Sequence, residues 1–234
     1  MFRGLQITPP FFEVGPKAYT FGPDMLRVAM RADQLGRAYG VGIIIDPQYV
    51  DISLIAEHVE WAMVFAPHMD SLEPGRGQGS VLPEAVKAAG AVGVMLNHVE
   101  HRLSRAELAR TVRRADEVGL ATMVCTDDVE EAVAVAGLEP NIIVVESPEL
   151  IGTGKGTESS SVAIAEIDQA IWRVNPEIRV LHGAGIGSAR DVFEVIAAGA
   201  QATGSSSGIF KAPDPQAMLE AMIRAAREAW DTRH

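Results

Sequence analysis

The sequence predicts an α/β fold in which eight parallel strands, each followed by a helix, close into a (β/α)8 barrel. From about residue 11 onward, short apolar runs alternate with longer segments of helical spacing, without a block of strands or of helices alone. Strands such as GIII and NIIVV are apolar on both faces, which is typical of a parallel sheet that helices cover. A doubly wound open sheet is the alternative. Because no linker, charge run or low-complexity tract interrupts the series, we expect residues 1–234 to form a single domain.

The elements can be placed in order along the chain. We expect strands at roughly 11–15, 41–45, 61–66, 92–97, 120–125, 141–145, 178–182 and 200–204. Three helices have start signals: Ser104 with Glu107 has the spacing of a capping box, Ser188 with Asp191 is a weaker relative of it, and Asp214 precedes Pro215 at a first helical position. The connection at 67–82 is much longer than the others. A connection of that length is usually functional or interfacial, and a flexible insertion is the alternative.

Composition excludes several classes of partner. Twenty Lys and Arg against thirty-one Asp and Glu give a formal net charge of −11, which argues against binding to nucleic acid or to an anionic membrane. The single cysteine, Cys125, cannot form an intramolecular disulfide. The first residues have too short an apolar run and too much proline for a signal peptide or a membrane span, so we expect a cytoplasmic protein.

Candidate catalytic residues follow the strands, because the active site of such a barrel is built at the carboxyl ends of its strands. Lys17 follows the first strand, Asn97 and His98 follow the fourth, and Glu146 follows the sixth. Glu146 is a candidate general base if burial raises its basicity, and the alternative is a solvated or lysine-paired carboxylate. His98 could polarise a substrate oxygen, and the alternative is a structural histidine. We interpret Cys125, on the fifth strand, as structural.

The other histidines give weaker signals. His68 and His182 lie near strand ends and stay candidates, whereas His58, His101 and His234 are less favoured. We expect no metal site, because the sequence contains no His-x-His, Cys-x-x-Cys or HExxH spacing.

Two glycine-rich turns indicate a site for phosphate. The turns HGAGIGSARD (182–191) and ATGSSSG (202–208) follow the last two strands, where barrels of this kind commonly hold phosphate with backbone N–H groups. GAGIG also resembles part of a dinucleotide-binding fingerprint. Its GxGxG spacing and the lack of an acidic residue about twenty positions later make phosphate the favoured ligand.

Several motifs, taken in order, resemble the triosephosphate isomerase family. VESPELIGTG is similar to that family's sixth-strand signature, a catalytic glutamate followed by a hinged lid, and NHVEHR resembles its NHSERR. VGPK stands where the family has N-x-K, and HGAGIG and GIFKAPDP look most like its archaeal-type branch or a close sugar-phosphate isomerase relative. The resemblance covers nearly the whole chain and implies the (β/α)8 fold known as the TIM barrel.

The resemblance also implies a mechanism, an aldose–ketose isomerisation for which this family is the standard example of a glutamate base, a neutral histidine and a closing loop. Glu146 would move a proton between adjacent carbons of a small phosphorylated sugar, most simply dihydroxyacetone phosphate and glyceraldehyde 3-phosphate. His98 would polarise the oxygens of the enediolate, and Lys17 would stabilise its charge. Glu100, which would help to hold the lysine, and Asn97 are the supporting residues. The phosphate would be bound by Ile151, Gly152, Gly185, Ser206 and Ser207, and no metal or organic cofactor is implied.

Three departures from the family pattern leave the substrate open. The family's asparagine is Gly15 here, the serine after the catalytic histidine is Val99, and the proline after the glutamate is Ser147. A four-carbon ketose phosphate, resembling erythrulose phosphate, could use the room that glycine leaves, or water could fill it. A non-catalytic phosphate-binding barrel is a further alternative. In the family the loop corresponding to 67–82 inserts into a neighbouring subunit, which implies a homodimer or homotetramer.

Overall fold

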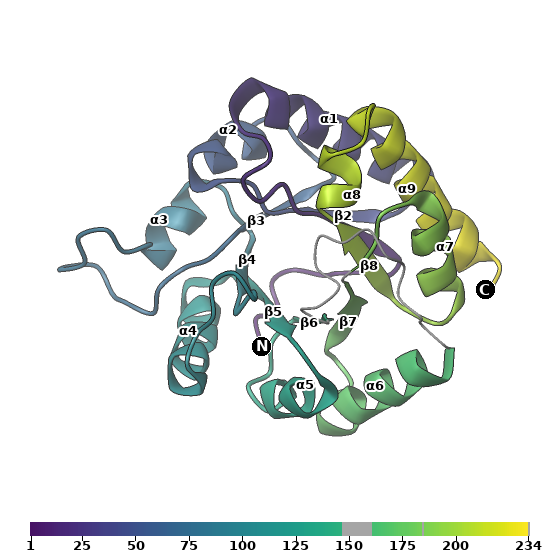
Figure 1. The fold of residues 1–234 in the computed structure, drawn as a ribbon. Helices are drawn as coiled ribbons and strands as arrows, with labels where there is room; N and C mark the ends of the chain where they lie inside the picture. The colour runs from purple at the N-terminus through teal and green to yellow at the C-terminus, as the bar shows by residue number, and fades with distance from the viewer. Residues whose placement is uncertain (147–160, 184, 234) are drawn as a thin grey trace.

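A computed structural model of the chain describes residues 1–146, 161–183 and 185–233. Its eight strands are parallel and close into a barrel in chain order, with β1 hydrogen-bonded both to β2 and to β8 (Figure 1). The helices surround the barrel. The predicted (β/α)8 barrel is confirmed, and the open-sheet alternative is wrong.

The elements have the following bounds. The strands are β1 (Phe11–Val14), β2 (Gly42–Ile45), β3 (Met63–Ala66), β4 (Gly93–Leu96), β5 (Ala121–Thr126), β6 (Ile142–Val145), β7 (Arg179–His182) and β8 (Ala202–Ser205). The helices are α1 (Gly22–Tyr39), the short 3-10 turn η1 (Tyr49–Asp51), α2 (Ile52–Ala56), α3 (Pro83–Ala88), α4 (Arg105–Val118), α5 (Val129–Ala136), α6 (Ser161–Val174), α7 (Ala189–Ala197), α8 (Ser207–Phe210) and α9 (Pro215–Asp231). Each predicted strand overlaps an observed one.

The strands bury both of their faces, as the sequence predicted. On β1, Phe12 packs outward among helix residues, whereas Phe11 packs in a second cluster that contains residues from all eight strands. This second cluster fills the barrel interior up to Met95, Cys125 and Val144, and it ends below the carboxyl ends of the strands.

The predicted helix starts are confirmed by their hydrogen bonds. The side chain of Ser104 accepts a hydrogen bond from the N–H of Glu107, and that of Ser188 accepts one from the N–H of Asp191. Asp214 accepts two backbone hydrogen bonds at the start of α9, where a proline occupies the first turn. No helix in the described ranges combines the length and the hydropathy of a membrane span.

The long connection between β3 and α3 projects away from the barrel (Figure 1). At its base the N–H of Val81 donates to Oδ2 of Asp70 at 2.7 Å, and the N–H of Asp70 donates to the carbonyl of Val81 at 3.0 Å. All residues from 73 to 80 are exposed. We call residues 70–81 the arm: the hydrogen bonds between Asp70 and Val81 close its base, and its tip at 73–80 is exposed.

Candidate active site

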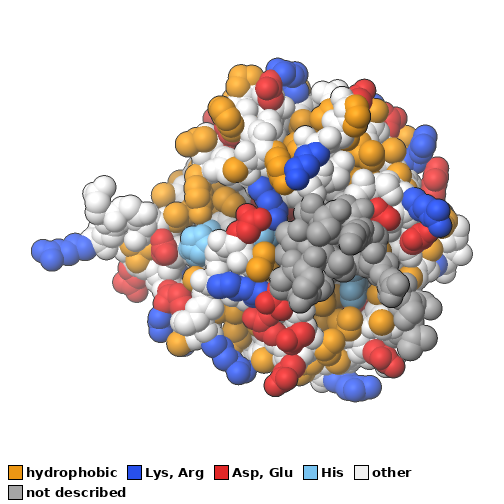
Figure 2. All heavy atoms as spheres, viewed as in Figure 1, with side chains coloured by type: hydrophobic (Ala, Val, Ile, Leu, Met, Phe, Trp, Pro, Cys, Tyr) orange, Lys and Arg blue, Asp and Glu red, His pale blue; other side chains and the backbone are white. Residues whose placement is uncertain are grey.

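A cavity of about 320 Å³ opens at the carboxyl ends of the strands. It is lined by seven of the residues that the sequence singled out: Lys17, His98, Glu100, Glu146, Gly185, Ser206 and Ser207. Two others, Ile151 and Gly152, lie outside the described residues. The view onto this end shows acidic and basic side chains interspersed over the face (Figure 2). An anionic ligand therefore depends on groups inside the cavity.

Glu146 is held at the end of β6 with its carboxyl group in the cavity. Its N–H donates to the carbonyl of Thr126 on β5 at 2.9 Å, which extends the sheet by one residue. Gly183 provides the space for the carboxyl, because a β-carbon at this position would lie 2.8 Å from Oε1 of Glu146. Burial raises the pKa of Glu146, and the charge of Lys17 opposes the increase. The result is a carboxylate that is more basic than one in water.

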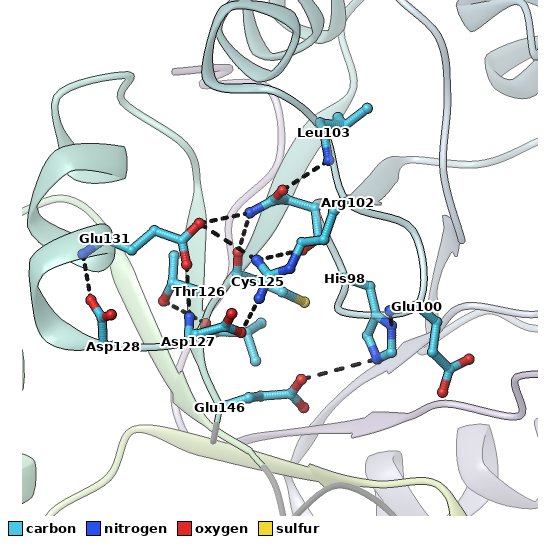
Figure 3. A network of polar contacts seen from close by, with 12 residues as sticks. His98, Glu100, Arg102, Leu103, Cys125, Thr126, Asp127, Asp128, Glu131 and Glu146 are labelled. Carbon is cyan, nitrogen blue, oxygen red and sulfur yellow. Dashed lines mark hydrogen bonds and ion pairs between the residues drawn. The ribbon is translucent and has the colours of Figure 1, made fainter. Parts of the chain in front are cut away.

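His98 faces Glu146 from the end of β4, with Nε2 at 4.0 Å from Oε2 of the glutamate (Figure 3). Its other nitrogen, Nδ1, accepts a hydrogen bond from the N–H of Glu100 at 3.0 Å. In a neutral ring the proton must then be on Nε2, the nitrogen that faces the cavity. Burial, followed by the charge of Lys17, lowers the pKa of His98 to about 4. His98 is therefore a neutral donor at physiological pH.

Lys17 extends from the loop after β1 and bonds to Glu100. The distance from Nζ to Oε1 of Glu100 is 2.7 Å, and this hydrogen bond lowers the pKa of the glutamate. The Lys17 backbone has a φ of 47°, in the left-handed region, and its carbonyl accepts from Nε2 of Gln48 at 2.6 Å. Contacts at both ends of the residue thus fix the ammonium group beside His98.

Asn97 is adjacent to His98 in sequence but does not line the cavity. Its Nδ2 donates to the carbonyl of Cys125 at 3.0 Å and to Oε1 of Glu131 at 3.1 Å, and its Oδ1 accepts from the N–H of Leu103 at 3.1 Å. Asn97 thus joins the loop after β4 to β5 and α5, and its supporting role stays a prediction. Cys125 lies on the inner face of β5, where burial raises the pKa of its thiol and keeps it protonated.

The two glycine-rich turns, after β7 and β8, pack against one another at the wall of the cavity. Ser205 donates from Oγ to the carbonyl of Ile186 at 2.7 Å. A β-carbon at Gly208 would lie 2.6 Å from Oγ of Ser205 and 2.7 Å from that carbonyl, so the contact requires glycine. Gly185 has a φ of 71°, which also favours glycine. The turns meet at the cavity wall beside Ser206, whose Oγ donates to the carbonyl of Gly15.

The remaining histidines separate into two groups. His182 faces the helices, and its Nε2 lies 2.8 Å from Oδ1 of Asp168 on α6, so it is structural. His68 and His101 both line the cavity and stack with ring centroids 4.0 Å apart. His101 was less favoured in the sequence because it lies five residues past β4, but it lines the cavity.

Sequence reasoning missed two acidic residues of the cavity, Glu13 and Asp46. Glu13 could have been noticed in the sequence, because it is the one charged residue in the strand FFEV and has apolar neighbours. The structure also corrects the interpretation of Gly15. We expected glycine to leave room for substrate or water, but a β-carbon there would overlap Oε1 of Glu13, so a carboxyl group occupies that space.

Comparisons with known proteins identify the family. The model of the family described as "Triosephosphate isomerase" matches residues 24–206. The triosephosphate isomerase of Methanobacterium bryantii is 40% identical over 85% of this chain and 88% of its own. The triosephosphate isomerase of Methanothermus fervidus is 37% identical over 86% of this chain and 91% of its own. That of Sulfolobus acidocaldarius is 35% identical over 96% of this chain and 98% of its own.

A solved structure shows the same fold. The crystal structure of triosephosphate isomerase from Bartonella henselae superposes with a TM-score of 0.70 at 19% identity, and the match covers 96% of this chain and all of that one. At that identity the superposition supports the barrel alone. The family model and the archaeal relatives decide the assignment: this chain belongs to the triosephosphate isomerase family.

Proposed function

We propose that this chain is an aldose–ketose isomerase that interconverts dihydroxyacetone phosphate and glyceraldehyde 3-phosphate through an enediolate. One observation carries the proposal: a largely but not fully buried carboxylate and the protonated nitrogen of a neutral imidazole face one another at 4.0 Å in a cavity that also contains an ammonium group. A base and an electrophile in this arrangement suit proton transfer next to a carbonyl. The names of the relatives point to the same substrates.

The reaction moves one proton between two carbons. Glu146 takes a proton from the hydroxymethyl carbon of the ketone, and the electron pair moves onto the carbonyl oxygen to form the enediolate. His98 donates a hydrogen bond to the oxygens that become negative, and Lys17 stabilises that charge. The hydroxyl proton on the first carbon's oxygen passes to the former carbonyl oxygen beside Nε2 of His98. Glu146 returns the carbon-bound proton to the neighbouring carbon, which gives the aldehyde. No atom is lost, and no redox partner is needed.

The phosphate is proposed to lie against Gly185, Ser206 and Ser207. These residues share the cavity with Lys17, whose charge complements an anion in a protein of net charge −11. The contacts of Ile151 and Gly152 with phosphate remain predictions from the resemblance. Among the described residues no group of three His, Cys, Asp or Glu side chains is arranged to hold a metal ion, and the proposed chemistry uses none.

The proposal is tested by the variant Glu146→Gln. The amide has nearly the same shape but cannot accept the proton, so kcat for glyceraldehyde 3-phosphate should fall by about 10²–10⁴-fold, the range typical of a general base. The exposed Glu57→Gln is the matched control and should keep the wild-type rate. An equally active Glu146→Gln enzyme would refute the mechanism. A wild type that exchanges no solvent deuterium into dihydroxyacetone phosphate would indicate the non-catalytic alternative.

A homodimer or homotetramer and a cytoplasmic location are part of the same proposal. The arm supports the assembly, because the eight consecutive residues 73–80 are exposed beyond a base that hydrogen bonds hold in place. Insertion into a second copy of the chain would bury this tip.

A further inference from the structure

Two carboxyl groups in the cavity have no part in the proposed mechanism. Glu13 lies on β1 two residues after the inward-facing Phe11, and Asp46 follows β2, the neighbouring strand, two residues after the inward-facing Ile44. Both line the same cavity as Lys17. Side chains alternate between the two faces of a strand, so residues two positions after Phe11 and Ile44 also point into the barrel. Both acids therefore lie at the mouth of the barrel, directly above its apolar core.

The cavity wall is adapted to the carboxyl group of Glu13. A β-carbon at Gly15 would overlap Oε1 of Glu13, and one at Gly204, on the neighbouring strand β8, would overlap Oε2. Two positions on different segments must both lack a side chain for this carboxyl group to lie where it does. The same β-carbon at Gly15 would lie 3.1 Å from Oγ of Ser206. Glu13 thus lies on the side of the cavity where the phosphate is proposed to bind.

Asp46 has an oxygen that lacks a partner. The residue is 7% exposed, and its Oδ1 is buried without a hydrogen bond. The carboxyl groups of Glu13 and Asp46 share the cavity, and burial raises the pKa of both. Leaving the buried Oδ1 of Asp46 unsatisfied is unfavourable. A ligand that donates a hydrogen bond would satisfy it.

A hydroxyl group is the part of a sugar phosphate that fits these acceptors. The phosphate is anionic, so carboxylate oxygens would repel it. The one hydroxyl group of a triose phosphate is on a reacting carbon, where Glu146 and His98 act, so a triose phosphate offers no hydroxyl group on the phosphate side of the cavity. A sugar with one more hydroxyl-bearing carbon, between the reacting carbons and the phosphate, places a donor on the phosphate side of the cavity.

We propose that Glu13 and Asp46 form a hydroxyl-binding subsite, and that the enzyme also isomerises four-carbon ketose phosphates of the erythrulose 4-phosphate type. This inference rests on the proposed function, because it uses the same base, electrophile and proton transfer. It differs from the expectation made from the sequence: the substrate is accepted through hydrogen bonds to two acids, not through empty space beside Gly15.

The test compares two substrates in four proteins: the wild type, Glu13→Gln, Asp46→Asn and the control Asp128→Asn. Asp128 caps α5 away from the cavity, and asparagine caps a helix equally well. The wild type should turn over both triose phosphate and erythrulose 4-phosphate. Loss of a hydrogen bond to a charged group should raise KM for erythrulose 4-phosphate by about 10–100-fold in the two cavity variants. The ratio of kcat/KM for erythrulose 4-phosphate to kcat/KM for triose phosphate should therefore fall by about 10–100-fold relative to the control.

The outcomes separate this inference from the function on which it rests. Turnover of triose phosphate without turnover of erythrulose 4-phosphate would overturn the subsite and leave the isomerase intact. An equal loss on both substrates would assign the pair to support of the catalytic residues, which also overturns the subsite. A wild type inactive on both substrates would reject the isomerase and the subsite together.

A second measurement uses only the wild type and so does not depend on the folding of variants. Erythritol 4-phosphate and butane-1,2,4-triol 4-phosphate differ by the one hydroxyl group next to the phosphate-bearing carbon. As competitive inhibitors of triose phosphate turnover, the first should bind at least about tenfold more tightly than the second. Equal inhibition constants would contradict a hydroxyl-binding subsite.

Discussion

Nε2 of His98 lies 4.0 Å from Oε2 of Glu146, although the two residues follow strands β4 and β6, which are not neighbours. Strand β5 connects them. The N–H of Glu146 bonds to the carbonyl of Thr126, and Nδ2 of Asn97, the residue before His98, bonds to the carbonyl of Cys125. Two consecutive carbonyl groups of one strand therefore set the separation of the proposed base and electrophile.

The first prediction concerns the dependence of activity on pH. With a pKa of about 4, His98 stays neutral above about pH 5, so it should not limit activity there. Glu146 must be ionised to act as a base, and burial raises its pKa above the ordinary 4.5. As pH falls, kcat/KM should decrease through that raised pKa. Steady-state kinetics between pH 4.5 and 8 test this. If NMR shows that His98 changes its protonation state above pH 6, the prediction of a neutral His98 is wrong.

The second prediction concerns Gly183. Replacement by alanine puts a methyl group 2.8 Å from the unperturbed position of Oε1 of Glu146, so the carboxyl group must move. We expect Gly183→Ala to lower kcat at least about tenfold, since a displacement of about 1 Å can reduce a rate 10²-fold. Gly137→Ala is the matched control, because its β-carbon would come no closer than 3.5 Å to another atom. Similar rates in the two variants would show that Gly183 is not needed.

The third prediction concerns stability. An aspartate in the unfolded chain loses its proton near its ordinary pKa of 3.8, whereas burial raises the pKa of folded Asp46 to about 7. Between these values the folded state binds more protons, so its stability decreases as pH rises through this window. Asp46→Asn should remove that decrease. The change that the substitution causes in the free energy of unfolding should be more stabilising at pH 8 than below pH 4, by roughly 2–4 kcal/mol. Urea unfolding of the wild type and the variant at both pH values measures this change. If the variant and the wild type differ in stability by the same amount at both pH values, the titration of Asp46 is not the cause.

The fourth prediction concerns the arm. The wild type should have a mass in solution that is a multiple of 25.0 kDa. Replacing residues 73–80 by two glycines removes the exposed tip and keeps the pairing of Asp70 with Val81, so the variant should be monomeric at the same concentration. Size-exclusion chromatography with light scattering decides this. A wild type of 25.0 kDa would contradict the proposed assembly.

The fold and seven residues of the cavity wall could be predicted from the sequence because both depend on position along strands. Strands apolar on both faces indicate a covered parallel sheet, and in a barrel every strand ends at the same rim, so Lys17, His98 and Glu146 could be grouped without coordinates. The structure adds the tautomer of His98, which depends on one backbone N–H that no pattern in the sequence reveals.

Glu13 could not be interpreted from the sequence because its position depends on contacts between segments far apart in the chain. The space for its carboxyl group is created by Gly15 and by Gly204, and it shares the cavity with Asp46. An acidic residue in a buried strand is an evident anomaly, but only the closed barrel shows that β8 and β2 flank it.

The overlap of Glu13 with any side chain at Gly15 or Gly204 also has an evolutionary consequence. In this geometry a side chain at 15 or 204 and the observed position of the Glu13 carboxyl group exclude each other, so a side chain at either position must displace that flexible group. The effects of substitutions at these three positions should therefore be strongly epistatic. Glu13, Gly15 and Gly204, read as a set, then serve as a marker by which relatives with this pocket can be sorted from those without it.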